Sequence, residues 1–182
     1  MPSNVEIKAR VADFSLLSNR ARQLSDAPEV VIPQVDTFFK TEKGRLKLRE
    51  LQAGRSQLIY YERPDQDGPK RSDYAIFETT NPTELKTLLS RALGTRGTVE
   101  KVRHLYMLGQ TRVHLDEVKG LGNFVELEVV LGPGQTEQEG QRIAEDLLSQ
   151  LGIDRRELLE SAYMDLIEEA KQQAAAPGRE TT

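Results

Sequence analysis

Residues 124–131 read FVELEVVL, and residues 112–116, a short way upstream, read RVHLD. In both segments polar and apolar side chains alternate, which is the period-two pattern of a β-strand whose two faces differ. Glu126 and Glu128 share one face of the first segment, whereas Arg112, His114 and Asp116 share one face of the second. The two segments therefore predict strands with a charged row on one face and an aliphatic row on the other.

Four further segments repeat this alternation: NVEIKAR at 4–10, RLKLR at 45–49, LIYYER at 58–63 and VEKVRHL at 99–105. Their polar faces carry, in chain order, Asn4, Glu6, Lys8, Arg10, Arg45, Lys47, Arg49, Tyr61, Arg63, Lys101 and Arg103. Helical patterns lie between these strands, at 13–24, at 82–94, at 136–152 and from Asp154 to Ile167. Helices between antiparallel strands predict an α+β fold.

The simplest interpretation of these strands is a sheet with one solvated face. However, the charges are sorted by sign, because 45–49 and 99–105 offer only cations on that face and 124–131 offers only carboxylates. A closed sheet with its apolar face outward under helices would instead gather all the charges inside. Only a highly charged ligand could balance so many buried charges.

Composition limits the kind of protein. The chain has 182 residues, no cysteine and a formal net charge of -4. We expect one domain over 1–171, a disordered tail at 172–182, and a soluble, cytoplasmic protein without a membrane segment or secretory signal. The absence of cysteine excludes disulfides and thiolate metal sites. A net negative charge argues against a general nucleic-acid binder and favours a small anionic ligand for the local basic clusters.

If the charged faces converge, nine cations surround four carboxylates. The cations are Lys8, Arg10, Arg45, Lys47, Arg49, Arg63, Lys101, Arg103 and Arg112, and the carboxylates are Glu6, Asp116, Glu126 and Glu128. Arginine and lysine bind phosphate oxygens, whereas carboxylates bind Mg²⁺ or Mn²⁺. Together they indicate a metal–polyphosphate ligand. The chain contains no P-loop and no G-x-G-x-x-G motif, so the nucleotide folds built on those motifs are not indicated.

Several segments resemble, in order, the conserved blocks of the CYTH superfamily of triphosphate tunnel proteins. VEIK at 5–8 is similar to the family's E-x-E-x-K signature. The later blocks are DTFFKTEKGRLKLRE at 36–50, LIYYERPD at 58–65, KVRHLY at 101–106 and HLDEVKGLGNFVELEVVL at 114–131. The chain resembles the class IV adenylyl cyclase branch of this family most closely.

This resemblance implies an antiparallel, eight-stranded β-barrel that holds a triphosphate and a divalent metal. By position, Glu6, Asp116, Glu126 and Glu128 resemble metal ligands, and Lys8, Arg45, Lys47, Arg49, Lys101 and Arg103 resemble triphosphate contacts, with Arg10, Arg63 and Arg112 on the same faces. Lys8, Arg103 and Glu6 are the residues that we expect to take part in catalysis.

Two departures from the family pattern bear on the reaction. Asn4 stands where the family has its first glutamate, so a second metal would be held less tightly. Tyr61 is followed by Glu62 instead of a lysine, so the phosphate contact there falls to Arg63 or Lys70. Three functions stay open: an adenylyl cyclase, a triphosphate hydrolase and a non-catalytic triphosphate-binding module. We also consider His114 as a general base and the apolar stripe of the last helix as either core or a homodimer surface.

Overall fold

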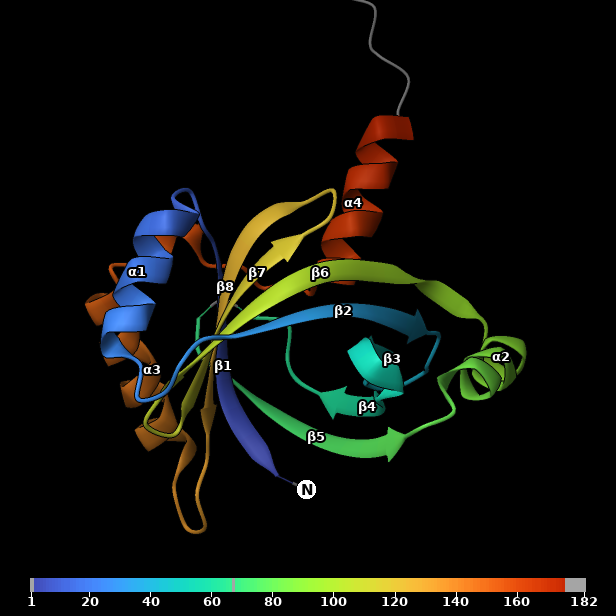
Figure 1. Ribbon diagram of the computed structural model, residues 1–182, viewed down its shortest axis with the longest axis horizontal. Helices are drawn as coiled ribbons and strands as arrows, with labels where there is room; N and C mark the ends of the chain where they lie inside the picture. Colours follow the sequence, from blue (N-terminus) through green and yellow to red (C-terminus); the bar gives the residue numbers. More distant parts are fainter. Residues whose placement is uncertain (1, 67, 176–182) are drawn as a thin grey trace, which may run out of the picture.

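The computed structural model describes residues 2–66 and 68–175. Within these residues all the strands form one closed antiparallel barrel, in the order β1-β5-β4-β3-β2-β6-β7-β8 (Figure 1). The strands are β1 (Ser3–Arg10), β2 (Val30–Phe39), β3 (Arg45–Leu51), β4 (Ser56–Glu62), β5 (Lys70–Thr79), β6 (Thr95–Leu108), β7 (Thr111–Val118) and β8 (Gly122–Val130). The predicted eight-stranded barrel is therefore confirmed, and the open sheet with one solvated face is wrong.

Strand β1 closes the barrel because it pairs with β5 on one side and with β8 on the other. Glu6 lies opposite Lys70 of β5 and opposite Glu128 of β8. Lys8 lies opposite Glu126. The register of this one strand thus brings two cations and three carboxylates from distant parts of the sequence onto the inner face.

The alternation pattern predicts six of the strands and misses β2 and β5. The inward positions of β2 hold Ile32, Gln34, Asp36 and Phe38, all of which line the interior. Because this row mixes apolar and polar side chains, it does not differ from the outer row, and no alternation is visible in the sequence. The inward row of β5, which contains Lys70, Ser72, Tyr74 and Ile76, is mixed in the same way.

The described helices are α1 (Phe14–Leu24), α2 (Pro82–Leu93), α3 (Glu137–Leu151) and α4 (Tyr163–Ala175). The first three begin and end close to the predicted residues. Asp13 caps α1 by accepting a hydrogen bond from the Leu16 amide at 2.9 Å. Thr136 and Glu139 form a reciprocal capping box at the start of α3, and Gly152 ends it in the left-handed conformation.

The predicted helix from Asp154 to Ile167 is wrong in its first half. A short 3₁₀ turn (Arg155–Glu157) is followed by an extended segment, and α4 begins only at Tyr163. Strand β5 pairs with β1 only as far as Glu6, which leaves backbone groups of the second half of β1 unpaired on that side. The extended segment takes these groups, since Leu158 bridges to Ala9 and the Leu159 amide donates to the Lys8 carbonyl at 2.9 Å.

Helix α4 continues to Ala175, so residues 172–175 of the expected tail are helical. The remainder of that expected tail, 176–182, lies outside the described residues. No helix in the described part of the chain is both long and apolar enough to cross a membrane.

Two apolar clusters hold the barrel in shape. In the first, α1 and α3 cover the outer face of β1, β7 and β8, where Ile7, Val113 and Leu127 are almost fully buried (Figure 1). In the second, α4 packs Tyr163 and Met164 against strand residues such as Phe38, Val99 and Phe124. Each fully buried aliphatic side chain contributes roughly 1.5–3 kcal/mol to folding. The apolar start of α4 is therefore part of the core.

Candidate functional site

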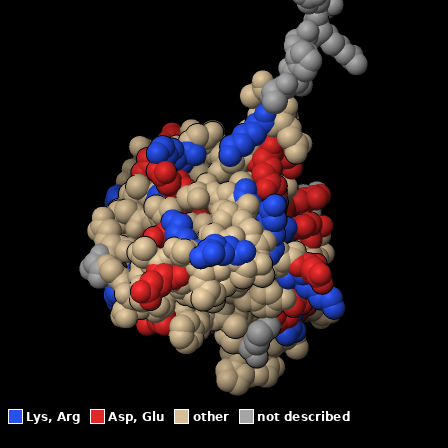
Figure 2. Space-filling view, turned by 90° about the vertical axis from the view of Figure 1, so that its right-hand side faces the viewer, with Lys and Arg blue, Asp and Glu red and all other residues tan. Residues whose placement is uncertain are grey.

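The barrel encloses a cavity of about 360 Å³ that receives side chains from all eight strands and from the start of α4. Ten of the predicted ligand-contacting residues line it: Glu6, Lys8, Lys47, Arg49, Arg63, Lys101, Arg103, Arg112, Glu126 and Glu128. On the outer face shown in Figure 2, basic and acidic side chains are scattered among neutral ones, as on an ordinary solvated surface. Inside, the charged side chains from β3 and β6 are only cations and those from β8 are only carboxylates, whereas β1 contributes both.

Asp116 on β7 is an anchor for the cations of β6. It lies opposite Arg103, and it accepts hydrogen bonds from the Lys101 ammonium at 2.7 Å and from two nitrogens of Arg103 at 2.7 and 2.6 Å. The Tyr163 hydroxyl adds a fourth bond at 3.0 Å. Burial by itself raises the pKa of Asp116, but the charges of Arg103 and Lys101 outweigh it and hold the pKa well below its ordinary value. The structure therefore places Asp116 among cations, although the sequence predicts a metal ligand.

Asp36 on β2 is a second anchor, and the sequence analysis does not identify it. Its carboxylate accepts a hydrogen bond from Lys47 at 2.9 Å, two from Arg49 at 3.0 and 3.2 Å and one from Gln34 at 3.2 Å. Burial tends to raise the pKa of Asp36, yet Arg49 and Lys47 hold it well below its ordinary value. Asp36 has no charged neighbour two residues away on β2, so the alternation pattern does not reveal it. The sequence indicates this residue only by its position at the start of the block 36–50 that resembles the family.

Three carboxylates face the cavity beside these cations. Glu126 lies 2.9 Å from the Lys8 ammonium and 2.5 Å from Arg103. Glu128 lies 3.0 Å from Arg112, and Glu6 forms an ion pair with Arg63. Burial raises the pKa of Glu126, but Lys8, Lys101 and Arg103 lower it far more, so this carboxylate is ionised at neutral pH. Each of these three carboxylates thus has a cation partner.

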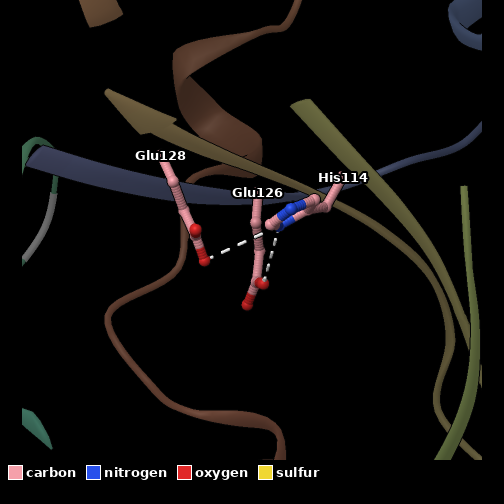
Figure 3. Close-up of side chains that lie close together, drawn as sticks. All are labelled: His114, Glu126 and Glu128. Atoms are coloured by element: carbon pink, nitrogen blue, oxygen red, sulfur yellow. Dashed lines mark ion pairs between the residues drawn. The ribbon is translucent and has the colours of Figure 1, made fainter. Parts of the chain in front are cut away.

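His114, Glu126 and Glu128 form the group best placed to hold a metal among the described residues. One ligand atom from each lies within 4.8 Å of the others (Figure 3). Burial, reinforced by Arg103, lowers the pKa of His114 to about 3. The imidazole is therefore neutral at pH 7 and would be a weak general base, because an efficient base has a pKa near the working pH.

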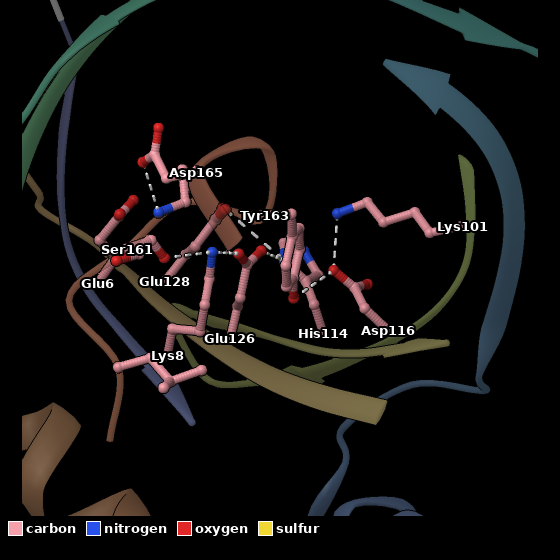
Figure 4. A network of polar contacts seen from close by, with 12 residues as sticks. Glu6, Lys8, Lys101, His114, Asp116, Glu126, Glu128, Ser161, Tyr163 and Asp165 are labelled. Carbon is pink, nitrogen blue, oxygen red and sulfur yellow. Dashed lines mark hydrogen bonds and ion pairs between the residues drawn. The ribbon is translucent and has the colours of Figure 1, made fainter. Parts of the chain in front are cut away.

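The start of α4 and the segment before it line the same site (Figure 4). The Lys8 ammonium lies 3.8 Å from the centre of the Tyr163 ring, and that of Lys101 lies 4.6 Å from it. Lys8 also donates to the Ser161 carbonyl at 3.4 Å. In the sequence, Tyr163 lies within the apolar stripe of the predicted last helix. The spacing of apolar residues does not show that its hydroxyl group enters the site.

Two predicted triphosphate contacts lie away from the cavity. Arg10 is exposed at the end of β1, above the ring of Phe124 at 5.2 Å. Arg45 pairs with Asp65 at 2.8 Å and with Asp165 of α4 at 3.2 Å.

Of the two residues suggested to replace the missing lysine, Arg63 and Lys70, only one lines the cavity. Arg63 lines the cavity, whereas the buried Lys70 ammonium donates to the carbonyls of Glu160 at 2.8 Å and Gln66 at 3.0 Å. Asn4, which replaces the first motif glutamate, is buried in the cavity wall, and its side-chain oxygen has no hydrogen-bond partner among the described residues.

Along three neighbouring strands the charged part of the cavity wall gives way to apolar side chains at one end, and Phe38 of β2 and Val99 of β6 add apolar side chains on the opposite side. Leu51 follows Arg49 on the inner row of β3, Leu105 follows Arg103 on β6, and Ile32 precedes Gln34 on β2. Because these strands are antiparallel neighbours with Gln34 opposite both Leu51 and Lys101, the three apolar side chains lie toward the same end. This arrangement suits a ligand with one charged and one less polar part.

Comparison with known proteins gives a consistent result. The family model described as CYTH domain matches residues 3–163. The chain is 26% identical over 178 residues to "Adenylate cyclase CyaB" of Aeromonas hydrophila, and the match covers 91% of this chain and 89% of that protein.

Solved structures show the same architecture. The PH1012 protein of Pyrococcus horikoshii OT3 is 25% identical, with a TM-score of 0.80 over 90% of this chain and 98% of that one. HpAC1 of Hippeastrum, named for adenylyl cyclase and described as having a dominant triphosphatase activity, is 19% identical. Its TM-score is 0.59, and the match covers 92% of this chain and 96% of that one. At this identity the likeness to HpAC1 shows the fold alone.

Proposed function

Since the chain belongs to the CYTH domain family, we propose that it is a metal-dependent enzyme that binds ATP in the barrel and converts it to cyclic AMP and pyrophosphate. The observation that carries this proposal is the pairing of sorted, buried charges around one cavity. Asp36 and Asp116 hold four cations in place, and Glu126 and Glu128 face the same space. Such a lining is costly to bury unless a highly charged ligand completes it.

The residues present fit a divalent metal. Glu126 and Glu128 offer carboxylate oxygens, with Glu6 opposite Glu128 on β1, and hard oxygen donors are those that Mg²⁺ and Mn²⁺ prefer. When bound there, the metal would neutralise phosphate oxygens and help to hold them in line for attack.

The existing ion pairs explain how a triphosphate could enter without leaving buried charges unpaired. Lys8 and Arg103 both form ion pairs with Glu126. A metal–triphosphate complex offers oxygens to the two cations and positive charge to the carboxylate, so each buried group exchanges one partner for another of the same sign. Asp116 meanwhile keeps the Arg103 guanidinium oriented.

In the proposed reaction the ribose 3′-oxygen attacks the α-phosphorus. The O3′–Pα bond forms, the bond from Pα to the bridging oxygen of the β-phosphate breaks, and the hydroxyl proton is released. Negative charge grows on the departing pyrophosphate, where Lys8 and Arg103 can stabilise it. The apolar end formed by Ile32, Leu51 and Leu105 supports an organic substrate, and the likeness to the Aeromonas cyclase supports cyclisation.

Hydrolysis of a triphosphate is the second candidate. It needs only the charged part of the cavity, which would hold tripolyphosphate as well as a nucleotide. The fold that this chain shares with HpAC1, which is described as a triphosphatase, supports this alternative.

The test is to incubate the purified protein with ATP, and separately with tripolyphosphate, in Mg²⁺ or Mn²⁺ and to separate the products by ion exchange. Glu126→Gln should abolish turnover, whereas Glu100→Gln, a matched change at a half-exposed outer residue paired with Lys119, should not. Cyclic AMP and pyrophosphate would support the cyclase, and orthophosphate would support the hydrolase. Tight triphosphate binding without any product would replace both with a non-catalytic binding module.

A further inference from the structure

The Nδ1 atom of His114 is a buried polar atom without a hydrogen-bond partner among the described residues. His114 lies on the inner face of β7 and is only 4% exposed, so solvent at the surface does not satisfy this nitrogen. Buried polar atoms are hydrogen-bonded in about nine cases out of ten, and an exception in a functional cavity points to a missing ligand, ion or water.

The nitrogen points toward two carboxylates of the neighbouring strand, as Figure 3 shows. It lies 3.6 Å from Oε1 of Glu128 and 3.9 Å from Oε2 of Glu126, beyond hydrogen-bonding distance in both cases. Arg112 lies beside the other oxygen of Glu128, so Oε1 is the oxygen that faces the histidine.

These separations suit three atoms that share one cation. Two ligands that each lie about 2.1 Å from an ion are roughly 3.0–3.6 Å apart when they are adjacent in its coordination shell. The distance from Nδ1 to Glu128 falls at the upper end of this range, and the distance to Glu126 exceeds it by a few tenths of an ångström.

We propose that His114 Nδ1 is a metal ligand together with Glu126 and Glu128, and that this nitrogen makes the site prefer Mn²⁺ to Mg²⁺. The inference rests on the proposed metal dependence of the same cavity. Mg²⁺ favours an all-oxygen shell, whereas imidazole is a good ligand for transition metals. Two carboxylates alone would accept either ion, so the histidine is the residue that determines selectivity.

The test uses the full chain and Mn²⁺ alone, without a nucleotide. Pulsed electron paramagnetic resonance of the bound Mn²⁺ should show coupling to a ¹⁴N nucleus, and ¹⁵N-labelling of histidine in the wild-type protein should replace that coupling with ¹⁵N coupling. His114→Ala should remove the coupling and weaken Mn²⁺ binding at least as much as loss of an outer-shell partner does, about ten-fold, with little change for Mg²⁺.

The chain offers a matched control, because it contains two histidines. His104 lies outside the cavity, where it contacts Glu29 at 2.5 Å and Glu117 at 3.1 Å, so His104→Ala should leave both metal affinities unchanged. Glu128→Gln should weaken the binding of both Mn²⁺ and Mg²⁺. The isotope experiment keeps the test valid even if His114→Ala fails to fold.

The proposal would be overturned if bound Mn²⁺ showed no coupling to histidine and bound equally well to wild type and His114→Ala. In that case a water molecule would be the hydrogen-bond partner of His114 Nδ1. That result would leave the proposed reaction intact, because the carboxylates would still hold a metal. Conversely, histidine coupling in a protein that turns over neither ATP nor tripolyphosphate would sustain the metal site and reject the proposed enzyme.

Discussion

At the residue scale, the inner surface contains carboxylates that hold several cations in place and others that face the open cavity. Asp116 and Glu128 both lie on inner strand faces, yet Asp116 accepts four hydrogen bonds, three from cations and one from Tyr163, whereas one oxygen of Glu128 faces an unpartnered nitrogen. The same residue class therefore has two roles, which only the three-dimensional partners distinguish.

Substitution of these two carboxylates should separate the roles. Asp116→Asn leaves Lys101 without its hydrogen-bonded counter-charge and leaves Arg103 with Glu126 alone, so the free energy of unfolding should fall by roughly 3–5 kcal/mol while metal binding changes little. Glu128→Gln should have the opposite profile, with metal affinity lost and a smaller change in stability. Chemical denaturation and Mn²⁺ titration of both variants provide the measurements. A loss of Mn²⁺ binding in Asp116→Asn would instead support the predicted role of Asp116 as a metal ligand.

Lys47 should make the affinity for a triphosphate depend on pH. Burial, only partly offset by Asp36, lowers the pKa of its ammonium to about 8. The amine is mostly charged at pH 7 and mostly neutral at pH 9, whereas a bound triphosphate favours the charged form. Affinity should therefore fall as the pH rises through 8, and binding at pH 9 should take up protons.

Calorimetry in two buffers with different ionisation enthalpies measures this proton uptake. Lys47→Arg is the control, because a guanidinium stays charged throughout this range. Titration of the triphosphate itself is common to both proteins and cancels in their difference. Identical pH profiles for the two proteins would remove Lys47 from the binding site.

At the element scale, helices α1 and α3 hold the charged strands in place from outside the cavity. Helix α3 lies so close to β1 that Gly140 has no space for a side chain. A Cβ atom at this position would lie 2.7 Å from Cδ2 of Leu131 and 2.8 Å from Cγ2 of Val5. This contact fixes α3 against the strand that carries Glu6 and Lys8.

Gly140→Ala should therefore destabilise the protein, although alanine is the better helix former. The helix propensity gain is about 1 kcal/mol, while forcing a methyl group into a packed core costs typically 1–3 kcal/mol, so a net loss of about 1 kcal/mol is expected. Gln138→Ala, at an exposed position in the same turn, should change the unfolding free energy by less than about 0.5 kcal/mol. Equal stability of the two variants in urea would show that α3 is free to shift outward.

The elements also show which parts of the fold could be predicted. Strands with a clear contrast between their faces, such as 45–49 and 124–131, were predicted, because the barrel puts charge inside and aliphatic groups outside. Strands β2 and β5 carry mixed rows on both faces, so periodicity gave no signal there. The last helix was placed too early because Leu158, Leu159 and Ala162 have helical spacing, although 158–159 bonds to β1 instead.

The site was predictable to the same extent. Residues in charged rows, such as Lys101, Arg103, Glu126 and Glu128, were predicted and do line the cavity. Asp36 was missed because it is a single charged residue on a strand whose rows mix polar and apolar side chains. Tyr163 was missed because it is a core residue whose hydroxyl group alone reaches the site. Arg10 and Arg45 were included because they lie on the charged faces of their strands. However, these rows of charged residues extend beyond the ends of the cavity.

At the scale of the whole molecule, the buried charges predict that a triphosphate stabilises the fold strongly. A ligand at 100 times its Kd adds about 2.7 kcal/mol, and for a chain of this size each kcal/mol raises the Tm by roughly 2–4 °C. Saturating tripolyphosphate or ATP with Mn²⁺ should therefore raise the Tm by about 5–11 °C, while the same ionic strength of chloride should not. Thermal unfolding measures the shift, and its absence at saturation would contradict a site inside the barrel.

The closure of the barrel through β1 has a consequence for how the chain is made. Asn4 of β1 lies opposite Val130 of β8, so the first strand of this barrel to be synthesised pairs with the last one. Contacts this far apart in sequence are formed late and slowly. Until then Glu6 and Lys8 have no neighbours from β8, and the proposed ligand site is incomplete. Biosynthesis thus delays the assembly of the site until nearly the whole sheet has been translated.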